Sequence, residues 1–246
     1  MFGLFGEDYR AAFGELLRAH LDAAQKRKSG CAKWCAFWPM VGRKFRPGGV
    51  MVVGRALNGW GDSAFTCESL SAPGGTEALI ARCRDTFAPA DSCPMVWVQQ
   101  RWHSGATCRT SRSQFWQTAC RLATHHGYRE QDWPSSIVWT NLMRVSPARG
   151  GNPPDWSYSA QLGPAAKLLD YELRDLRPGV AVLLTGPEWY RPFRERTGLF
   201  RLREVHLEHV HYVGQHGPTR MIVCDHPQRR SPDRIMREIV QHWPQA

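Results

Sequence analysis

The sequence lacks any apolar run long enough to cross a membrane. A spanning helix needs about 18 or more consecutive apolar residues, whereas the longest run here, Val180–Leu184, has the length of a strand. Residues 1–13 carry Glu7 and Asp8 and contain neither a basic nor an apolar segment, so no secretory signal is expected. These absences predict a soluble, cytoplasmic protein with no membrane partner.

The cysteines lack the paired spacing of a metal or disulfide site. None of the eight forms a CxxC pair, and the nearest two, Cys31 and Cys35, are separated by three residues. In an intracellular chain such cysteines are more often reduced thiols. His209 and His211 share one face of an expected strand, but two imidazoles without a third ligand do not close a zinc site. We therefore expect no metal and no other cofactor.

Acidic residues are few beside the basic ones. Asp and Glu number 22 against 32 Lys and Arg, which gives a net charge of +10 and a pI of about 9.5. Such a surplus favours a polyanionic partner, most commonly nucleic acid, although a basic surface kept for solubility is the alternative. The basic residues form scattered clusters mixed with aromatics, which favours a folded groove over a basic tail. Hydrophobic residues at 42% exclude intrinsic disorder.

Hydrophobic periodicity predicts helices that alternate with short strands. Helices are expected over residues 8–28, 76–87, 113–126, 160–176 and 232–242. Strands are expected over residues 50–54, 136–143, 180–185 and 220–224, with a strand-like segment at 95–98. Residues 55–75 and 147–154 are rich in Gly, Ser, Asn and Pro, which predicts loops.

This alternation predicts an α/β fold, namely a three-layer α/β/α sandwich around a central, mostly parallel four-stranded sheet. The 246 residues fit a single domain, in which residues 1–48 form a helical, basic N-terminal extension packed on the rest. We expect a monomer without an obligate protein partner.

Polar residues follow the expected strands at their carboxyl ends, where parallel sheets place their functional loops. The first strand leads into a loop that starts at Gly54 and Arg55 and reaches Asp62. The second strand ends at Asn141, and His226 follows the last strand. We therefore expect these residues to lie close together.

The order of these motifs resembles the uracil-DNA glycosylase superfamily. The resemblance rests on the glycine-bearing loop, the asparagine of TNLMRVSP at 140–147, Asn152–Pro153, LRDLRPGVAVLLTG at 173–186 and the late His-Pro, in order over residues 49–240. It implies a four-stranded parallel sheet between helices that binds duplex DNA and flips one nucleotide into a pocket.

The resemblance assigns roles residue by residue. His226 matches the histidine that donates a hydrogen bond to the departing base, whose negative charge develops in the transition state. Asn141 matches the asparagine that reads the Watson–Crick edge, since one amide offers both a donor and an acceptor. Arg229 and Arg230 occupy the loop where the family places its duplex-penetrating side chain. Taken singly, Asn141 also fits a strand-end turn and His226 an ordinary exposed histidine.

The first motif departs from the family pattern. Ala56 and Leu57 stand where family members usually have an Asp, Asn or Glu that positions water and then a proline. Water positioning then falls to Asn58 or to Asp62, the two other catalytic candidates. Iron–sulfur branches carry a second cysteine pair after the asparagine motif, but residues 121–223 hold no cysteine, so we expect no cluster.

Further residues are expected around a flipped base. Trp60 and Phe65 are the nearest candidates to stack on it, with core packing as the alternative, and Gly54 and Arg55 would border it. The candidate DNA-binding residues are Arg109, Arg112, Arg144, Arg229 and Arg230.

The loop composition predicts the substrate. Asn58 falls where strict uracil enzymes hold a bulky aromatic against the 5-position of the base, and Gly59, Gly61, Ser63 and Ala64 add little bulk. We therefore expect a DNA glycosylase that releases a 5-substituted or hypermodified pyrimidine and leaves an abasic site. The superfamily includes an antiphage enzyme that excises such bases from bacteriophage DNA, and this chain resembles that branch.

Three other functions remain open. An ordinary uracil-DNA glycosylase of base-excision repair would take its aromatic wall from Trp60. A catalytically silent DNA-binding relative would fit Ala56 and Leu57. An unrelated basic α/β enzyme, such as a nucleotide hydrolase, is disfavoured because Gly54–Ser63 lacks the lysine of a phosphate-binding loop.

Overall fold

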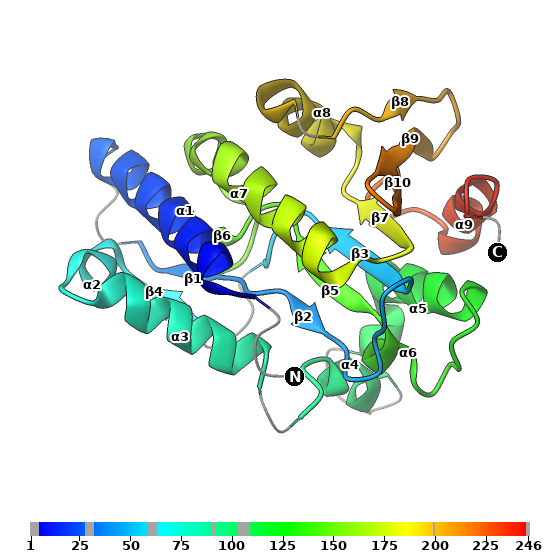
Figure 1. The fold of residues 1–246 in the computed structure, drawn as a ribbon, viewed down its shortest axis with the longest axis horizontal. Helices are drawn as coiled ribbons and strands as arrows, with labels where there is room; N and C mark the ends of the chain where they lie inside the picture. The colour runs from blue at the N-terminus through cyan, green and yellow to red at the C-terminus, as the bar shows by residue number, and fades with distance from the viewer. Residues whose placement is uncertain are drawn as a thin grey trace.

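The computed structural model describes residues 5–27, 32–58, 63–89, 92–102, 109–198 and 200–244, which form helices packed on two sheets (Figure 1). The larger sheet has seven strands in the order β2-β5-β3-β7-β10-β9-β8, and the smaller has the order β4-β1-β6. The strands are β1 Trp34–Ala36, β2 Met40–Val41, β3 Val50–Gly54, β4 Ala64–Phe65, β5 Val138–Asn141, β6 Val145–Pro147, β7 Val180–Leu184, β8 Arg203–Glu204, β9 Val210–His216 and β10 Thr219–Cys224.

The helices agree with the hydrophobic periodicity in most places. They are α1 Glu7–Lys26, α2 Cys67–Ser71, α3 Gly75–Phe87, α4 Val96–Gln100, the 3-10 turn η1 Thr110–Arg112, α5 Gln114–His125, α6 Trp133–Ser136, α7 Asp155–Leu176, α8 Pro187–Thr197 and α9 Pro232–Val240. Within the described ranges, no helix has the length and apolar character needed to cross a membrane. The predicted strand-like segment at 95–98 is wrong, because these residues enter α4.

Four parallel strands form the centre of the larger sheet. β5, β3, β7 and β10 are adjacent and parallel, and they correspond to the four strands expected from the sequence. The mixed α/β class is therefore confirmed, but the predicted sheet was too small. β2 extends one edge antiparallel to β5, and the β9–β8 pair extends the other edge beyond β10.

The smaller sheet joins β4, β1 and β6, of which β4 lies in a predicted loop and β1 in the predicted N-terminal extension. β1 pairs with β4 on one side and with β6 on the other, in both cases antiparallel. Because β1 and β2 both come from residues 1–48, this segment supplies strands to both sheets and does more than pack on the domain. β4 and α2 fall within residues 55–75, where a loop was expected.

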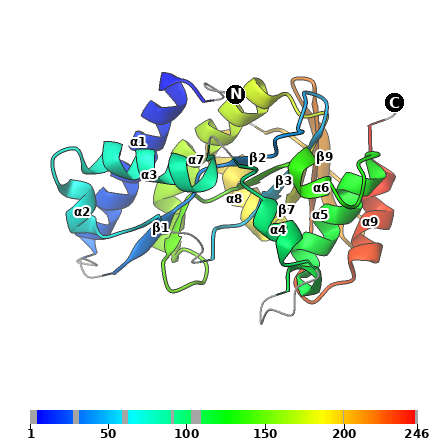
Figure 2. The same ribbon diagram turned by 90° about the horizontal axis from the view of Figure 1, so that it is seen from below.

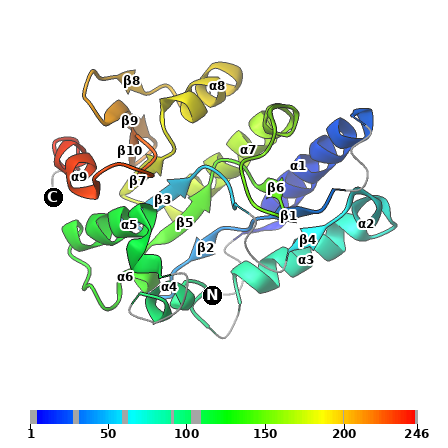
Figure 3. The same ribbon diagram turned by 180° about the vertical axis from the view of Figure 1, so that it is seen from behind.

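Helices cover both faces of the larger sheet. α7 lies over one face with α1 packed beside it, and α5 and α9 pack together over the other (Figures 1 and 2). The view from behind shows α5 and α9 in front of the central strands, with α7 beyond them (Figure 3). Burial on both faces explains why β3 and β7 are continuous apolar runs, VMVVG and VAVLL, in which every residue is buried.

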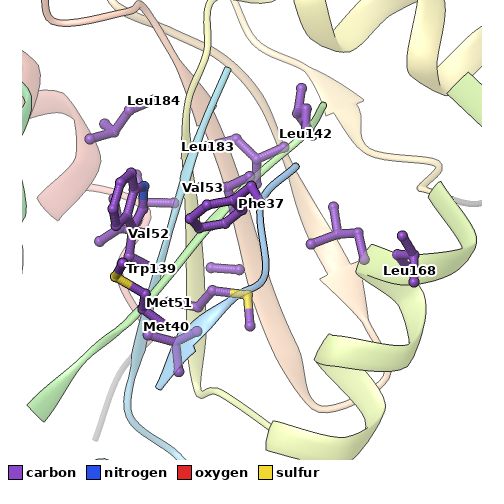
Figure 4. Packing of buried hydrophobic residues seen from close by; sticks show 14 of the residues in the cluster. Phe37, Met40, Met51, Val52, Val53, Trp139, Leu142, Leu168, Leu183 and Leu184 are labelled. Carbon is purple, nitrogen blue, oxygen red and sulfur yellow. The ribbon is translucent and has the colours of Figure 1, made fainter. Parts of the chain in front are cut away.

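The core therefore has two layers separated by the central strands. Val53 and Leu183 are partners on adjacent strands and lie together, while Trp139 and Leu168 lie apart from each other in the cluster (Figure 4). Trp139 packs edge-on against Trp116 of α5, with ring centroids 4.9 Å apart. Since side chains alternate along a strand, Asn141 projects to the same α5 side of β5 as Trp139.

A buried ion pair joins β5 to α7 and α1. Arg144 follows β5 and is fully buried, and its Nη2 lies 2.7 Å from Oε1 of Glu172 in α7. Tyr9 of α1 donates its hydroxyl to the same Oε1 at 2.6 Å, and Arg144 Nη1 donates to Thr140. Arg144 therefore has no exposed surface with which to bind DNA, which corrects its assignment as a DNA contact.

This network predicts a large loss of stability when it is broken. Glu172→Ala should lower the free energy of unfolding by about 3–5 kcal/mol, because it leaves the Arg144 guanidinium buried and unpaired. The matched control is Glu15→Ala, which breaks the half-exposed Lys167–Glu15 pair (3.0 Å) between the same two helices and should cost about 0–1 kcal/mol. Urea unfolding of both variants measures the difference, and equal losses would contradict this account.

Candidate active site

A cavity of about 580 Å³ lies beyond the carboxyl ends of β3, β5 and β10. It brings together six of the residues predicted from the sequence: Gly54, Arg55, Asn58, Arg112, Asn141 and His226. Its other lining residues are Ala56, Leu57, Ser113, Gln114, Phe115, Trp116, Trp139, Gly151, Asn152 and Gln228. The expectation that the strand ends converge is therefore confirmed for the described residues.

The side chain of Asn141 is held against the backbone of β3. Asn141 is the register partner of Gly54 in the parallel pairing, and Leu142 N donates to Gly54 O at 2.8 Å. A Cβ placed on Gly54 would overlap Asn141 Oδ1, so only glycine leaves room for the amide. Asn141 is 1% exposed, and among the described residues its Nδ2 has no hydrogen-bond partner. A buried donor without a partner at a cavity wall is placed to bind a ligand acceptor.

His226 is half-buried and is held in one tautomer. Its Nδ1 accepts the backbone N–H of Gln228 at 3.3 Å, so the proton of the neutral ring resides on Nε2. Desolvation, followed by the positive charge of Arg55, lowers the pKa of His226 from 6.5 to about 4. The imidazole is therefore neutral at physiological pH and offers Nε2–H as a donor.

Arg55 follows β3 and is tied to the loop after β7. Its Nε donates to Thr185 O at 2.6 Å, and its Nη2 pairs with Glu188 at the start of α8. The guanidinium also lies over the ring of Trp189, 5.5 Å from the centroid. These contacts fix the position of a positive charge beside His226.

Asp225 anchors the segment that carries His226. Its Oδ2 lies 3.1 Å from His209 Nδ1 and 2.9 Å from Arg230 Nε, and its Oδ1 lies 3.0 Å from His211 Nε2. His209 and His211 therefore share a carboxylate partner. Asp225 was not predicted from the sequence as the partner of these three side chains. Its one signal in the sequence is that it directly precedes His226.

Arg112 lines the cavity, and three further arginines lie close to lining residues in the sequence. Arg112 is exposed at the end of η1, and Arg109 is exposed just before it. Arg229 is exposed and has a left-handed backbone (φ 62°), stabilised by donation of its N–H to Gln114. Arg230, in contrast, is committed to Asp225 with its side chain 49% exposed. Arg229 is therefore freer than Arg230 to contact a ligand.

Asn58 lines the cavity and joins two of its loops. Its backbone is left-handed (φ 53°), and its Oδ1 accepts the N–H of Gly151 at 2.6 Å. This bond links the loop after β3 to the loop after β6. It engages the amide oxygen of Asn58 and not its amide nitrogen. Two other predicted residues, Trp60 and Asp62, lie outside the described residues.

The aromatic wall differs from the predicted one. Phe65 is buried in β4, 6.1 Å from the ring of His20, and does not line the cavity. The wall is made instead by Phe115, Trp116 and Trp139. Sequence reasoning missed these because Phe115 and Trp116 occupy the apolar face of α5 and read as core residues. Ser113 caps the start of this helix. Its position in the sequence was the one signal that the first turn of α5 lies near the strand ends.

The cavity combines groups suited to a flat, polar heterocycle. Aromatic faces can stack on such a ring, and the Asn141 amide and His226 Nε2–H can bind its edge. None of the described lining residues carries a carboxylate or a thiol. A water molecule in this cavity would therefore be positioned by amide or backbone groups and not by an acidic side chain among them.

The low pKa of His226 can be tested directly. An NMR titration of its ring should give a pKa of about 4, with the signal assigned by its loss in His226→Gln. Arg55→Gln should raise the pKa toward 6.5, because it removes the cationic charge that disfavours imidazolium, although desolvation keeps the pKa below that value. Arg112→Gln is the control and should leave it unchanged. A pKa near 6.5 in the parent would contradict the lowering of the pKa by burial and Arg55, and a pKa well above 7 would overturn the neutral-donor assignment.

Comparison with known proteins adds no family to this description. The chain matches no protein-family model and no curated protein sequence.

Proposed function

We propose that this protein is a DNA glycosylase that hydrolyses the N-glycosidic bond of a flipped pyrimidine. One observation carries the proposal: the neutral donor of His226 and the unpartnered buried amide of Asn141 line the same cavity at the carboxyl ends of parallel strands. The same two residues carry the resemblance to the uracil-DNA glycosylase superfamily.

In the proposed reaction, the bond between C1′ of the sugar and N1 of the base breaks, and the base departs as an anion. Nε2–H of His226 donates to the 2-oxygen, where negative charge develops. A neutral imidazole suits this task, because its Nε2–H is a very weak acid and stabilises the anion by a hydrogen bond without transferring its proton. Asn141 Nδ2 donates to an acceptor on the Watson–Crick edge of the base, which is the 4-oxygen of a uracil or N3 of a cytosine. Water adds its oxygen to C1′, and its proton neutralises the base.

Positioning of the water is assigned to Asn58 or Asp62. Asn58 lines the cavity, and its Oδ1 is engaged by Gly151, so its amide group has a fixed orientation. Ala56, at the position where relatives carry an acidic or amide residue, lines the cavity with only a methyl group. This departure favours the silent DNA-binding relative as the second candidate function.

The proposed partner is double-stranded DNA. Arg109, Arg112 and Arg229 are exposed at or near the cavity, and the whole chain carries a net charge of +10. Left-handed Arg229 stands at the tip of the loop after His226, which supports its role as the side chain that fills the gap in the duplex. We propose that the protein acts as a monomer in the cytoplasm.

The proposed substrate is a 5-substituted pyrimidine of the kind that some bacteriophages carry. A cavity of about 580 Å³ is larger than a single pyrimidine ring needs, and exposed Asn58 stands where a strict uracil enzyme has an aromatic. Because rejection of a 5-substituent depends on a steric clash, a site without that wall accepts larger bases. An ordinary uracil-DNA glycosylase is the alternative.

Excision should depend on His226 and Asn141. In single-turnover assays, His226→Ala should slow release of the base by about 10²-fold or more while DNA affinity stays nearly unchanged, since the donor acts mainly in the transition state. Asn141→Ala should reduce both rate and selectivity among bases. His206→Ala, an exposed histidine outside the cavity, is the matched control. Unchanged rates in both site variants would refute the assignment, and DNA binding without any release would favour the silent relative.

The choice of substrate should distinguish a glycosylase for 5-substituted pyrimidines from an ordinary uracil-DNA glycosylase. Duplexes that carry uracil, 5-hydroxymethyluracil, 5-hydroxymethylcytosine or its glucosylated form are incubated with the protein, and alkali-labile sites are scored. We expect release of at least one 5-substituted base, with His226→Ala as the control for contaminating activity. Release of uracil alone would show that a side chain blocks the 5-position of the base and would favour the repair enzyme.

A further inference from the structure

His209, outside the cavity, has a buried ring nitrogen that no described group binds. Its side chain is 4% exposed, and Nδ1 lies 3.1 Å from the carboxylate of Asp225. Within the described residues Nε2 has no hydrogen-bond partner, although it lies 3.5 Å from Oε1 of Glu208. The bond to Asp225 places the ring proton on Nδ1, so Nε2 presents a lone pair toward a carboxylate.

A second carboxylate approaches from α9. Oε2 of Glu238 accepts the backbone N–H groups of His209 at 2.7 Å and of Val210 at 2.9 Å. These two bonds fix the carboxylate at the start of β9 and engage only one of its oxygens. One ligand atom from each of Glu208, His209 and Glu238 lies within 4.8 Å of the others.

We propose that Glu208, His209 and Glu238 bind a divalent transition-metal ion such as Zn²⁺. A lone pair that faces two carboxylates is unfavourable unless a metal cation or a ring proton lies between them, and imidazole with carboxylate oxygens is a donor set that Zn²⁺ accepts. Asp225 supplies the outer hydrogen bond that orients a metal-binding histidine. Water molecules complete the coordination, because the side chain of Glu208 is 66% exposed.

Nearby cations do not replace the ion. Arg234 is the closest to Glu208, but its Nη1 lies 3.9 Å from Oε1 and both side chains are more than 60% exposed. Arg230 pairs with Asp225 and not with the three ligands. The bound metal therefore displaces one loose, solvated ion pair at little cost.

Metal binding would join three parts of the fold. Glu208 and His209 precede β9, Glu238 belongs to α9, and Asp225 connects the histidine to the segment that carries His226. The ion would clamp α9 to the edge of the larger sheet. The inference stands whether or not the protein is a glycosylase, because it uses a different set of residues.

The test is a Zn²⁺ titration of the full-length, chelator-treated protein, followed by calorimetry and thermal unfolding. We expect one ion per chain and a rise in melting temperature of about 5–10 °C at a hundredfold excess over Kd. Glu208→Gln should weaken binding about tenfold or more without unfolding the protein, because this side chain is exposed. Glu204→Gln, an exposed change on neighbouring β8, is the matched control and should bind like the parent.

Two results would overturn the proposal. Absence of Zn²⁺ binding by the parent would indicate that His209 Nε2 carries a proton directed at Glu208. Equal binding by the parent and Glu208→Gln would show that the metal is held elsewhere on the surface. His209→Gln supplies a second variant that retains a donor toward Asp225 and should abolish binding if it folds.

Discussion

The close approach of the Asn141 side chain to the backbone of Gly54 is the contact around which the cavity is built. Parallel pairing of β3 and β5 in this register leaves the amide between two strand ends, and it fits only because residue 54 has no Cβ. The same pairing directs Trp139 toward α5, whose first turn supplies Phe115. A shift of one residue would send both Asn141 and Trp139 to the α7 side of the sheet.

The charged groups around each histidine and arginine decide its protonation state and its partners, which the sequence does not show. The chain carries a net charge of +10, yet His226 stays neutral because desolvation and the Arg55 guanidinium disfavour imidazolium. The guanidinium of Arg55 is held near His226 by its contacts with Glu188 and with Thr185 O. Asp225 likewise gathers His209, His211 and Arg230, so a single buried carboxylate organises the segment that leads into the cavity.

Local sequence patterns predicted those elements that depend on short-range periodicity. α1, α3, α5, α7 and α9 and the four central strands lie close to their expected positions, since an apolar run or an amphipathic repeat is a local property. The convergence of Gly54, Asn141 and His226 also followed, because parallel strands end at a common edge. By contrast, residues 95–98 are apolar in a short run whose length cannot distinguish a strand from a helix, and they became α4.

What the sequence alone determined was therefore the α/β class, the central strands and the strand-end residues of the cavity. Tertiary structure decided the rest, because it depends on partners distant in the chain. Arg144 was expected to be a DNA-binding cation, but it is buried and contacts Glu172, which also binds Tyr9. Phe65 was expected to stack on a base, but it is buried in β4. The edge strands β2 and β8 are only two residues long and form through pairing, with no periodic signal of their own. A side chain's charge and shape are local properties, but its burial and its partners are set only when the whole chain packs.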